Sequence, residues 1–169
     1  MHEEQSMMAG KIIENRMVAP GHFEMIVQLP SGFPSPSPGQ FVMIRKAERE
    51  EPLLARPLSV LGFQRQKDRT YLELLYRVAG KGTHLLACSK PGDELAILGP
   101  LGKGFTLPAG IRRVIFIAGG VGVAPLTFLL HGGLLASGTG EGIQKMFYLG
   151  ARSAELLAGL DRLEGFCDL

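Results

Sequence analysis

Over the first hundred residues, short apolar runs alternate with turn signals, which is the pattern of β-strands separated by loops. "APGH" (19–22), "QRQKDR" (64–69) and "KPGD" (90–93) are such turn signals. The segment "LPSGFPSPSPGQ" (29–40) carries four prolines and is predicted to be an exposed, extended loop. Strands are expected at residues 11–18, 23–29, 41–45, 57–63, 71–78 and 94–98, with a short helix at 84–89. Six strands at this spacing predict a closed antiparallel barrel over residues 1–100.

The pattern changes after residue 100, where a buried strand is followed by helical periodicity. Residues 114–118 are apolar and β-branched, as in a parallel strand buried on both faces. The order predicted from there is a helix at 124–136, a loop at 138–142, a strand at 145–150 and a helix at 153–163, with Ser153 as its N-cap. This β-α-β-α order predicts a doubly wound sheet. Two strands make no stable open sheet, so we interpret residues 101–169 as an incomplete parallel α/β domain.

Composition narrows the classes of protein to which the chain can belong. The 169 residues are 46% hydrophobic and 20% charged with a net charge of +2, which is typical of a folded protein of one ordinary or two small domains. No cluster of Lys and Arg stands out, so no nucleic-acid partner is expected. No apolar run approaches the ~20 residues of a membrane span. The start, "MHEEQSMMAG", lacks the order of a secretion signal, so a cytoplasmic location is expected.

The two cysteines give no sign of a disulfide or of a metal site. Cys88 and Cys167 lie far apart and belong to no CxxC pair. Cys88 falls in the apolar stretch "HLLACSK" and is expected to be a buried thiol. The sequence also contains no HExxH motif and no evident Ser-His-Asp or paired-carboxylate arrangement.

The first stretch that could carry chemistry is "ARPLSVLGF" (55–63). Arg56 and Pro57 open a strand, and Ser59 lies on the same face as Pro57. Proline removes a backbone donor, so this strand start faces either a ligand or solvent. Arg56 has the forked donors that suit a pyrophosphate, and Ser59 has a hydroxyl for a ring nitrogen. The alternative is an edge strand with a solvated arginine, and these residues alone fit that alternative better.

The second stretch is "LLYRVAGKGTHLL" (74–86), in which a strand runs through glycines into a helix. Gly80, Gly82 and Thr83 precede the predicted helix, where backbone N–H groups suit a phosphate. The spacing is not that of a P-loop. A flexible turn with Thr83 as N-cap is an equally good interpretation. His84 is expected on the helix surface.

The third stretch, "FIAGGVGVAPL" (116–126), places glycines at the carboxyl end of a parallel strand, where open α/β sheets bind ligands. Pro125 stands where the third glycine of a dinucleotide fingerprint belongs, which argues against the ordinary arrangement. Proline is acceptable there, in the first turn of a helix. Arg152, in "YLGARS" (148–153), stands where an acidic residue would hold the ribose of a dinucleotide. The choice between NADH and NADPH therefore stays open. A tight structural turn is the alternative.

Taken in order, these stretches resemble the ferredoxin-reductase-like flavoproteins, in which an FAD-binding barrel precedes a nicotinamide-binding α/β domain. The matching motifs are "PGQF" (38–41), "RPLS" (56–59), "GKGT" (80–83), "GGVGVAP" (119–125) and "GARS" (150–153). Within that family, "RPLS", "YRVAGKGTHLLA", "KPGDELAILGPLGKGF" and "IAGGVGVAPL" are most similar to the electron-transfer subunits of type-B dihydroorotate dehydrogenase. The resemblance implies cofactor-binding roles for Arg56, Pro57, Leu58, Ser59, Leu75, Tyr76, Arg77, Gly80, Gly82, Thr83, Gly119, Gly120, Gly122, Val123 and Pro125.

The resemblance also implies a path for electrons. Electrons would pass from NADH to FAD, then to a two-iron two-sulfur cluster, and then to the FMN of a dihydroorotate dehydrogenase catalytic subunit in a heterotetramer. The flavin would perform the hydride chemistry, so no side chain is expected to act as a general acid or base.

The chain departs from that family in its cysteines. An iron–sulfur cluster needs four closely arranged ligands. The family's cysteine-bearing C-terminal segment has no counterpart here, so we expect a truncated chain with an incomplete nicotinamide site. Two alternatives stay open. One is the flavoprotein subunit of another NAD(P)H-linked complex, such as a sulfide dehydrogenase or a ferredoxin:NADP reductase-like subunit. The other is a partner-binding module without a cofactor.

Overall fold

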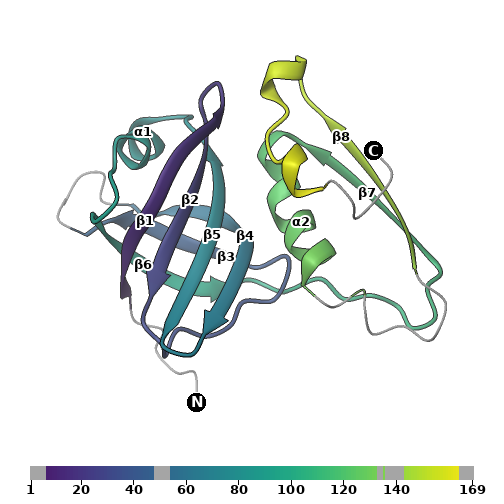
Figure 1. Cartoon of the computed structure of the whole chain (residues 1–169), viewed down its shortest axis with the longest axis horizontal. Helices are drawn as coiled ribbons and strands as arrows, with labels where there is room; N and C mark the ends of the chain where they lie inside the picture. The colour runs from purple at the N-terminus through teal and green to yellow at the C-terminus, as the bar shows by residue number, and fades with distance from the viewer. Residues whose placement is uncertain (1–6, 48–53, 133–134, 136–142, 164–169) are drawn as a thin grey trace.

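The computed structural model describes residues 7–47, 54–132, 135 and 143–163. Six strands come first, and they close into an antiparallel barrel in the order β1-β2-β5-β4-β3-β6 (Figure 1). All six were predicted from the sequence, each within a few residues of its observed bounds. The strands are β1 (Met8–Ala19), β2 (His22–Leu29), β3 (Phe41–Lys46), β4 (Arg56–Gln66), β5 (Arg69–Arg77) and β6 (Glu94–Leu101).

Alternation along the strands fills the barrel with aliphatic side chains, because successive residues of a strand point to opposite faces. Met25 and Val27 of β2 are fully buried, and so are Leu72 and Leu74 of the neighbouring β5. Gly10 of β1 lies against the same core. A Cβ on that residue would lie 2.7 Å from Val27 Cγ1, so the site has no room for a side chain.

The sequence predicted an exposed loop at residues 29–40, but this proline-rich loop is partly buried. Phe33 is 1% exposed and belongs to the barrel core. Its carbonyl oxygen accepts a hydrogen bond from Arg65 Nη2 at 2.6 Å. The loop is extended, but one aromatic side chain is drawn inward because burying a phenylalanine removes a large apolar area from water.

The helix α1 (Lys81–Ala87) begins three residues before its predicted start. Gly80 is its N-cap, so Thr83 is the third helical residue, and the interpretation of Thr83 as N-cap is wrong. His84 is exposed, as expected. Cys88 is exposed as well, which contradicts the expectation of a buried thiol. The reason is its place at the C-cap, where it turns outward while Leu86 packs into the barrel core.

One asparagine fastens α1 to the barrel. Asn15 of β1 donates from Nδ2 to the carbonyl oxygens of Leu86 and Ser89, both at 2.9 Å. Its Oδ1 accepts a hydrogen bond from the Tyr76 hydroxyl, also at 2.9 Å. A single side chain therefore joins β1, β5 and α1.

Burial raises the pKa of Tyr76 above its ordinary value near 10, and this effect outweighs the opposing hydrogen bond to Asn15. The raised pKa stabilises the fold fully below about pH 10, and that contribution is lost as the pH rises further. We expect the free energy of unfolding in urea to fall above pH 10. In Tyr76→Phe it should be about 1 kcal/mol lower at pH 8 but fall less at high pH. Tyr71→Phe is the control, and an unchanged pH dependence in Tyr76→Phe would contradict the argument.

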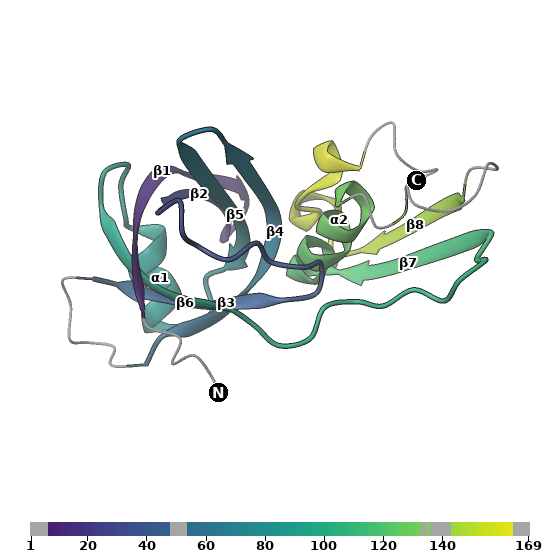
Figure 2. The same ribbon diagram turned by 90° about the horizontal axis from the view of Figure 1, so that it is seen from below.

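The second half of the chain is a small α/β layer. It consists of β7 (Arg113–Gly119), the short 3-10 turn η1 (Gly120–Gly122), α2 (Val123–His131) and β8 (Gln144–Gly150). The two strands are parallel, with Gly119 paired to Gly150 at their carboxyl ends. Figures 1 and 2 show α2 between the barrel and this sheet.

Among the described residues, this sheet is covered on one face only, which corrects the prediction of a strand buried on both faces. Phe116 and Phe147 lie on the covered face, with ring centroids 5.1 Å apart. On the other face Ile117 is 77% exposed and Tyr148 is 55% exposed. The difference arises because α2 supplies cover from a single side.

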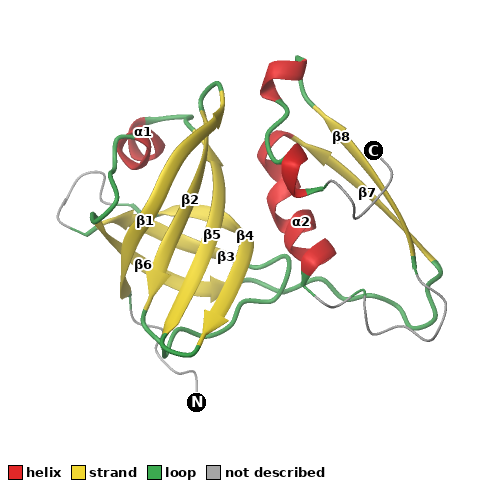
Figure 3. Cartoon of the chain, in the orientation of Figure 1, coloured by secondary structure: helices red, strands yellow, loops and turns green. Residues whose placement is uncertain are grey.

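Two further predictions of helices need correction. The helix predicted at 124–136 ends at His131, where Gly132 is the C-cap, and the loop predicted at 138–142 lies outside the described residues. Instead of a helix at 153–163 the chain forms two 3-10 turns, η2 (Ala154–Leu156) and η3 (Leu160–Arg162) (Figure 3). Gly159 separates them with φ +82°, a left-handed conformation that an α-helix does not contain.

The two halves share a hydrophobic core. Ala19, Leu61 and Leu75 point outward from the barrel and pack in one cluster with side chains of α2, β7 and β8. Leu129 and Phe116 are among their partners in that cluster. In the part of the chain that the structure describes, neither helix has the length and apolar character needed to cross a bilayer.

Candidate functional site

The start of β4 and the start of α1 meet at a small pocket, here called the helix-start pocket. The Arg56 side chain lies directly over Gly82, so closely that a Cβ on Gly82 would overlap Arg56 Nε and lie 3.2 Å from its Cγ. The absence of a side chain at Gly82 therefore makes room for the guanidinium. The pocket has a volume of about 320 Å³ and is lined by Arg56, Ala79, Gly80, Lys81, Gly82 and Thr83.

Thr83 fixes the backbone of this turn. Its Oγ1 accepts hydrogen bonds from the N–H groups of Ala79 at 2.8 Å and Gly80 at 3.2 Å. The first helical hydrogen bond runs from His84 N to Gly80 O at 2.9 Å. The N–H groups of Gly82 and Thr83 precede it and have no acceptor within the helix. A guanidinium beside such N–H groups is an arrangement that suits an anion, above all a phosphate.

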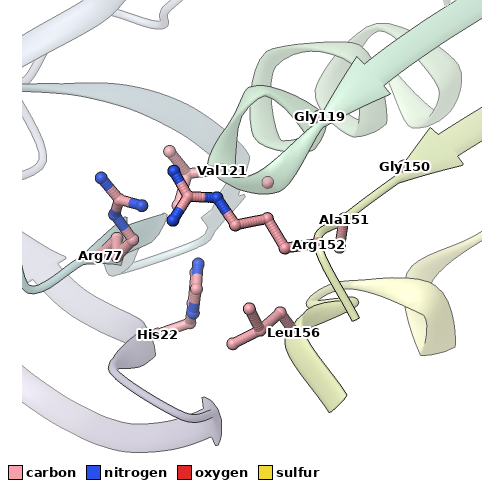
Figure 4. Close-up of a pocket in the computed structure, with 9 residues that line it drawn as sticks. His22, Arg77, Gly119, Val121, Gly150, Ala151, Arg152 and Leu156 are labelled. Carbon is pink, nitrogen blue, oxygen red and sulfur yellow. The ribbon is translucent and has the colours of Figure 1, made fainter. Parts of the chain in front are cut away.

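A larger pocket, here called the interdomain pocket, lies between the barrel and the carboxyl ends of β7 and β8 (Figure 4). Its volume is about 660 Å³. Gly120 has φ +52°, a left-handed conformation that favours glycine, and this lets the chain turn sharply after β7. The lining residues are His22, Arg77, Gly119, Gly120, Val121, Gly150, Ala151, Arg152 and Leu156.

The interdomain pocket is positively charged. Figure 4 shows the guanidinium groups of Arg77 and Arg152 directed toward the same space as the far ring nitrogen of His22. The near ring nitrogen, Nδ1, lies 2.9 Å from the carbonyl oxygen of Pro20 and is therefore the donor, which leaves Nε2 for the pocket. None of the nine lining residues is acidic. The pocket thus favours an anionic ligand with polar groups.

The structure divides the predicted site residues into three groups. Some line the helix-start pocket, namely Arg56, Gly80, Gly82 and Thr83. Others line the interdomain pocket, namely Arg77, Gly119 and Gly120. The remainder line neither pocket. The side chains of Leu58, Leu75, Tyr76 and Val123 are buried in the core, and Pro57 and Ser59 lie on the outer face of β4. Gly122 is the N-cap of α2, and Pro125 belongs to the first turn of that helix.

The alternative interpretation of "RPLS" as an edge strand does not hold for β4 as a whole, because β4 pairs with β3 and with β5. The four residues of "RPLS" pair with β3, and the pairing with β5 begins at Val60. Leu58 and Val60 point into the barrel, and they alternate along β4 with Pro57 and Ser59, which point outward. The two outward residues therefore face the outer surface of a closed barrel, beside the position of Arg56.

Several residues of the interdomain pocket were not among the predicted site residues: His22, Val121, Gly150, Ala151, Arg152 and Leu156. The motif "GARS" did point to Gly150 and Arg152, although it gave no position for them in space. His22 carries no local signal, because it reaches the pocket through the pairing of His22 with Arg77 across β2 and β5. Leu156 was assigned to a helix that does not form.

Comparison with known proteins identifies the family of the chain. No family model matches it. The dihydroorotate dehydrogenase B (NAD(+)) electron transfer subunit of Desulforamulus reducens is 46% identical over 121 residues, which are 72% of this chain and 45% of that protein. The same subunit of Geobacillus thermodenitrificans is 41% identical over 118 residues, 68% of this chain and 45% of the relative. The chain belongs to the family of these electron transfer subunits. It spans about half the length of the curated relatives it matches.

Solved structures agree with this electron-transfer-subunit family in fold. An NADH-dependent reduced ferredoxin-NADP oxidoreductase is 27% identical, with a TM-score of 0.77 over all of this chain and 56% of its own. The ferredoxin-NADP+ reductase of Plasmodium falciparum, at 20% identity and a TM-score of 0.75, covers 95% of this chain and 65% of its own. The prediction of an antiparallel barrel followed by a parallel α/β layer of the ferredoxin-reductase kind is confirmed.

Proposed function

We propose that the chain binds FAD on its barrel and takes part in electron transfer between a nicotinamide dinucleotide and a dihydroorotate dehydrogenase catalytic subunit. The observation that carries this proposal is the Arg56 guanidinium seated over Gly82 at the start of α1. A flavin dinucleotide has a pyrophosphate at its centre, and this cradle suits a group of that charge and size. The family of electron transfer subunits supports the same assignment.

The residues present fit FAD by their chemistry. Arg56 would hold the pyrophosphate together with the N–H groups of Gly82 and Thr83, while Thr83 keeps the turn in shape through its hydroxyl. Ser59 and Pro57 on the outer face of β4 would lie along the flavin. When bound, FAD supplies the hydride acceptor and passes the electrons on. The side chains place the cofactor and exclude water, and none is required as an acid or base.

The interdomain pocket would hold the nicotinamide dinucleotide. Its walls combine a glycine turn after a parallel strand, where the backbone approaches a ligand closely, with the positive charges of Arg77 and Arg152. An anionic dinucleotide suits both features.

A two-iron two-sulfur cluster does not fit this chain. Cluster ligation needs four closely arranged ligands, and the sequence holds two cysteines, Cys88 and Cys167. Among the described residues no group of three His, Cys, Asp or Glu side chains gathers as metal ligands do. We therefore derive no step through such a cluster. Transfer onward would go to a dihydroorotate dehydrogenase catalytic subunit, the partner that the name of the relatives implies. We propose FMN as the electron acceptor in that subunit.

The proposal is tested by the flavin released when the purified protein is denatured, separated by chromatography against FAD and FMN. Near-stoichiometric FAD supports it. Bound FMN contradicts the assignment of the pyrophosphate cradle, because FMN has no pyrophosphate. Absence of any flavin from folded protein that also fails to take up added FAD favours a partner-binding module without a cofactor, which the exposed Ile117 and Tyr148 would suit.

The charge of the interdomain pocket gives a second test. Arg152→Gln should raise the Kd for NADH by about tenfold to a hundredfold, the effect of losing one charge-assisted hydrogen bond. Binding can be followed through the fluorescence of NADH at low and at high salt, and the effect of the substitution should shrink as salt screens the charge. The control is Arg113→Gln, since Arg113 is exposed and bonds Gln144 away from the pocket. Equal Kd values for the two variants would contradict the assignment.

A further inference from the structure

Two carboxylates are buried on the outer face of the barrel, at the surface that meets the α/β layer. Glu24 of β2 is 4% exposed, and Glu73 of β5 is 6% exposed. β2 and β5 are neighbours, and Glu24 and Glu73 lie two register positions apart on the same side of the sheet. Gly62 of β4 lies opposite Glu73, and a Cβ there would come 3.1 Å from Glu73 Cδ. The glycine thus makes the space that the carboxylate occupies.

Both carboxylates accept hydrogen bonds from one guanidinium, which belongs to the other half of the molecule. Arg162 of η3 donates from Nη1 to Glu73 Oε2 at 2.7 Å and from Nη2 to Glu24 Oε2 at 3.2 Å. Burial disfavours the charged guanidinium, yet Glu24 and Glu73 outweigh this effect and raise the pKa of Arg162. Burial lowers the pKa of His131, which lies near Arg162 and Glu73. Buried charges of this kind are costly unless they are paired.

Arg162 belongs to the segment that forms one wall of the interdomain pocket. That segment leaves β8 at Gly150, contributes Arg152 and Leu156 to the pocket, and ends at Leu163, which is fully buried in the shared core. Its Gly159 lies against Val123, which follows the glycine turn of the opposite loop. A fixed Arg162 therefore holds both pocket loops of the α/β layer at once.

We propose that Arg162 is a positioning residue whose bridge to Glu24 and Glu73 sets how the α/β layer, with Arg152 and the Gly119–Gly120 turn, faces His22 and Arg77 on the barrel. The bridge is a polar contact between the barrel and the segment after β8, and that segment contributes Arg152 and Leu156 to the interdomain pocket. Its effect on domain placement is independent of any ligand. Only its effect on electron transfer rests on the proposed function.

The chain contains a matched control for this bridge. Arg16 of β1 donates to the same Glu24 Oε2 at 2.6 Å, but Arg16 and Glu24 both belong to the barrel half of the chain. Arg16→Met removes an ion pair with Glu24 and leaves the bridge between the halves. Arg162→Met removes the bridge itself. Arg162→Lys keeps the charge but loses the fork that serves two carboxylates at once.

Domain placement can be measured by spin labels at Asp68→Cys on the barrel and Arg112→Cys on the α/β side, both exposed, in full-length protein carrying Cys88→Ser and Cys167→Ser. Arg162→Met should broaden the distribution of distances between the two labels. Arg162→Lys should give a distribution of intermediate width, and Arg16→Met should leave it as narrow as in the unsubstituted protein. Arg162→Met combined with Glu24→Gln and Glu73→Gln removes the unpaired charges, so it stays folded if the single variant does not. A distribution as narrow as that of the unsubstituted protein in this triple variant would overturn the proposal.

The kinetic measurement is the reduction of bound FAD by NADH in a stopped-flow instrument. Arg162→Met, or the triple variant if the single one does not fold, should slow reduction by roughly tenfold or more, since small misplacements of reactants cost large factors in rate. FAD content should stay unchanged, because Arg162 lies far from the helix-start pocket in the sequence and does not line it. Unchanged reduction with unchanged distances overturns the positioning role. Absence of FAD from the unsubstituted protein contradicts the proposed function instead, and the distances then decide on the bridge.

Discussion

Replacing Arg56 with alanine is expected to strip FAD from the purified protein. The guanidinium lies over Gly82 at the helix start, and each charge-assisted hydrogen bond to a pyrophosphate is worth about 1.5–3 kcal/mol. The loss of two such bonds raises the Kd for FAD by at least about a hundredfold. The ratio of flavin absorbance to protein absorbance after gel filtration measures the result, and a titration of the stripped protein with FAD gives the Kd. The fold should persist, because Arg56 is not part of either core cluster.

Gly82→Ala tests the same cradle without removing the charge. A Cβ at that position would overlap Arg56 Nε, so the guanidinium must move away and the FAD affinity should fall in the same direction. Gly32→Ala is the control, since a Cβ at Gly32 meets no atom within 4 Å and the residue lies outside both pockets. Arg56→Lys should retain some affinity through its charge. Undiminished FAD content in Arg56→Ala would count against this placement of the site.

The barrel could be predicted from local patterns because its turns are chemically marked. Gly21 has φ +68° and Gly92 has φ +97°, conformations that favour glycine. The glycine-containing motifs "APGH" and "KPGD" therefore predict the turns at which strands end. The helix after β5 was harder to place. Its start depends on the Thr83 hydroxyl folding back on Ala79 and Gly80, and nothing in the spacing of apolar residues encodes that contact.

The site could be predicted only where a sequence motif marks it. Gly82 and Gly119 belong to such motifs, and each lines a pocket. His22 and Arg162 do not, because their positions follow from pairings between distant parts of the chain. Arg162 lies 138 residues from Glu24, to which it donates. No local pattern connects two such residues.

A second large effect is expected from a residue in no motif. In Asn15→Ala, the carbonyl oxygen of Ser89 loses its side-chain donor and the buried Tyr76 hydroxyl loses its acceptor, while the carbonyl oxygen of Leu86 keeps one donor, the Ser89 N–H at 3.0 Å. Each buried polar group left without a partner costs about 1–3 kcal/mol, so the free energy of unfolding in urea should fall by roughly 3 kcal/mol. The helix α1 would come loose from β1. Amide hydrogen exchange should accelerate there, for example at Cys88, whose N–H bonds His84 O at 3.1 Å.

Two further variants separate the parts of this effect. Asn15→Asp keeps an acceptor for Tyr76 but loses the donors to α1, so it should loosen the helix with less harm to the barrel. Asn15→Ala combined with Tyr76→Phe leaves no orphaned hydroxyl and should cost less than the sum of the single changes. Because α1 carries Gly82 and Thr83, FAD affinity should fall in every variant that frees the helix. If Asn15→Ala destabilises the protein no more than Tyr76→Phe, then Asn15 does not hold α1, and the helix start owes its position to Leu86 in the core alone.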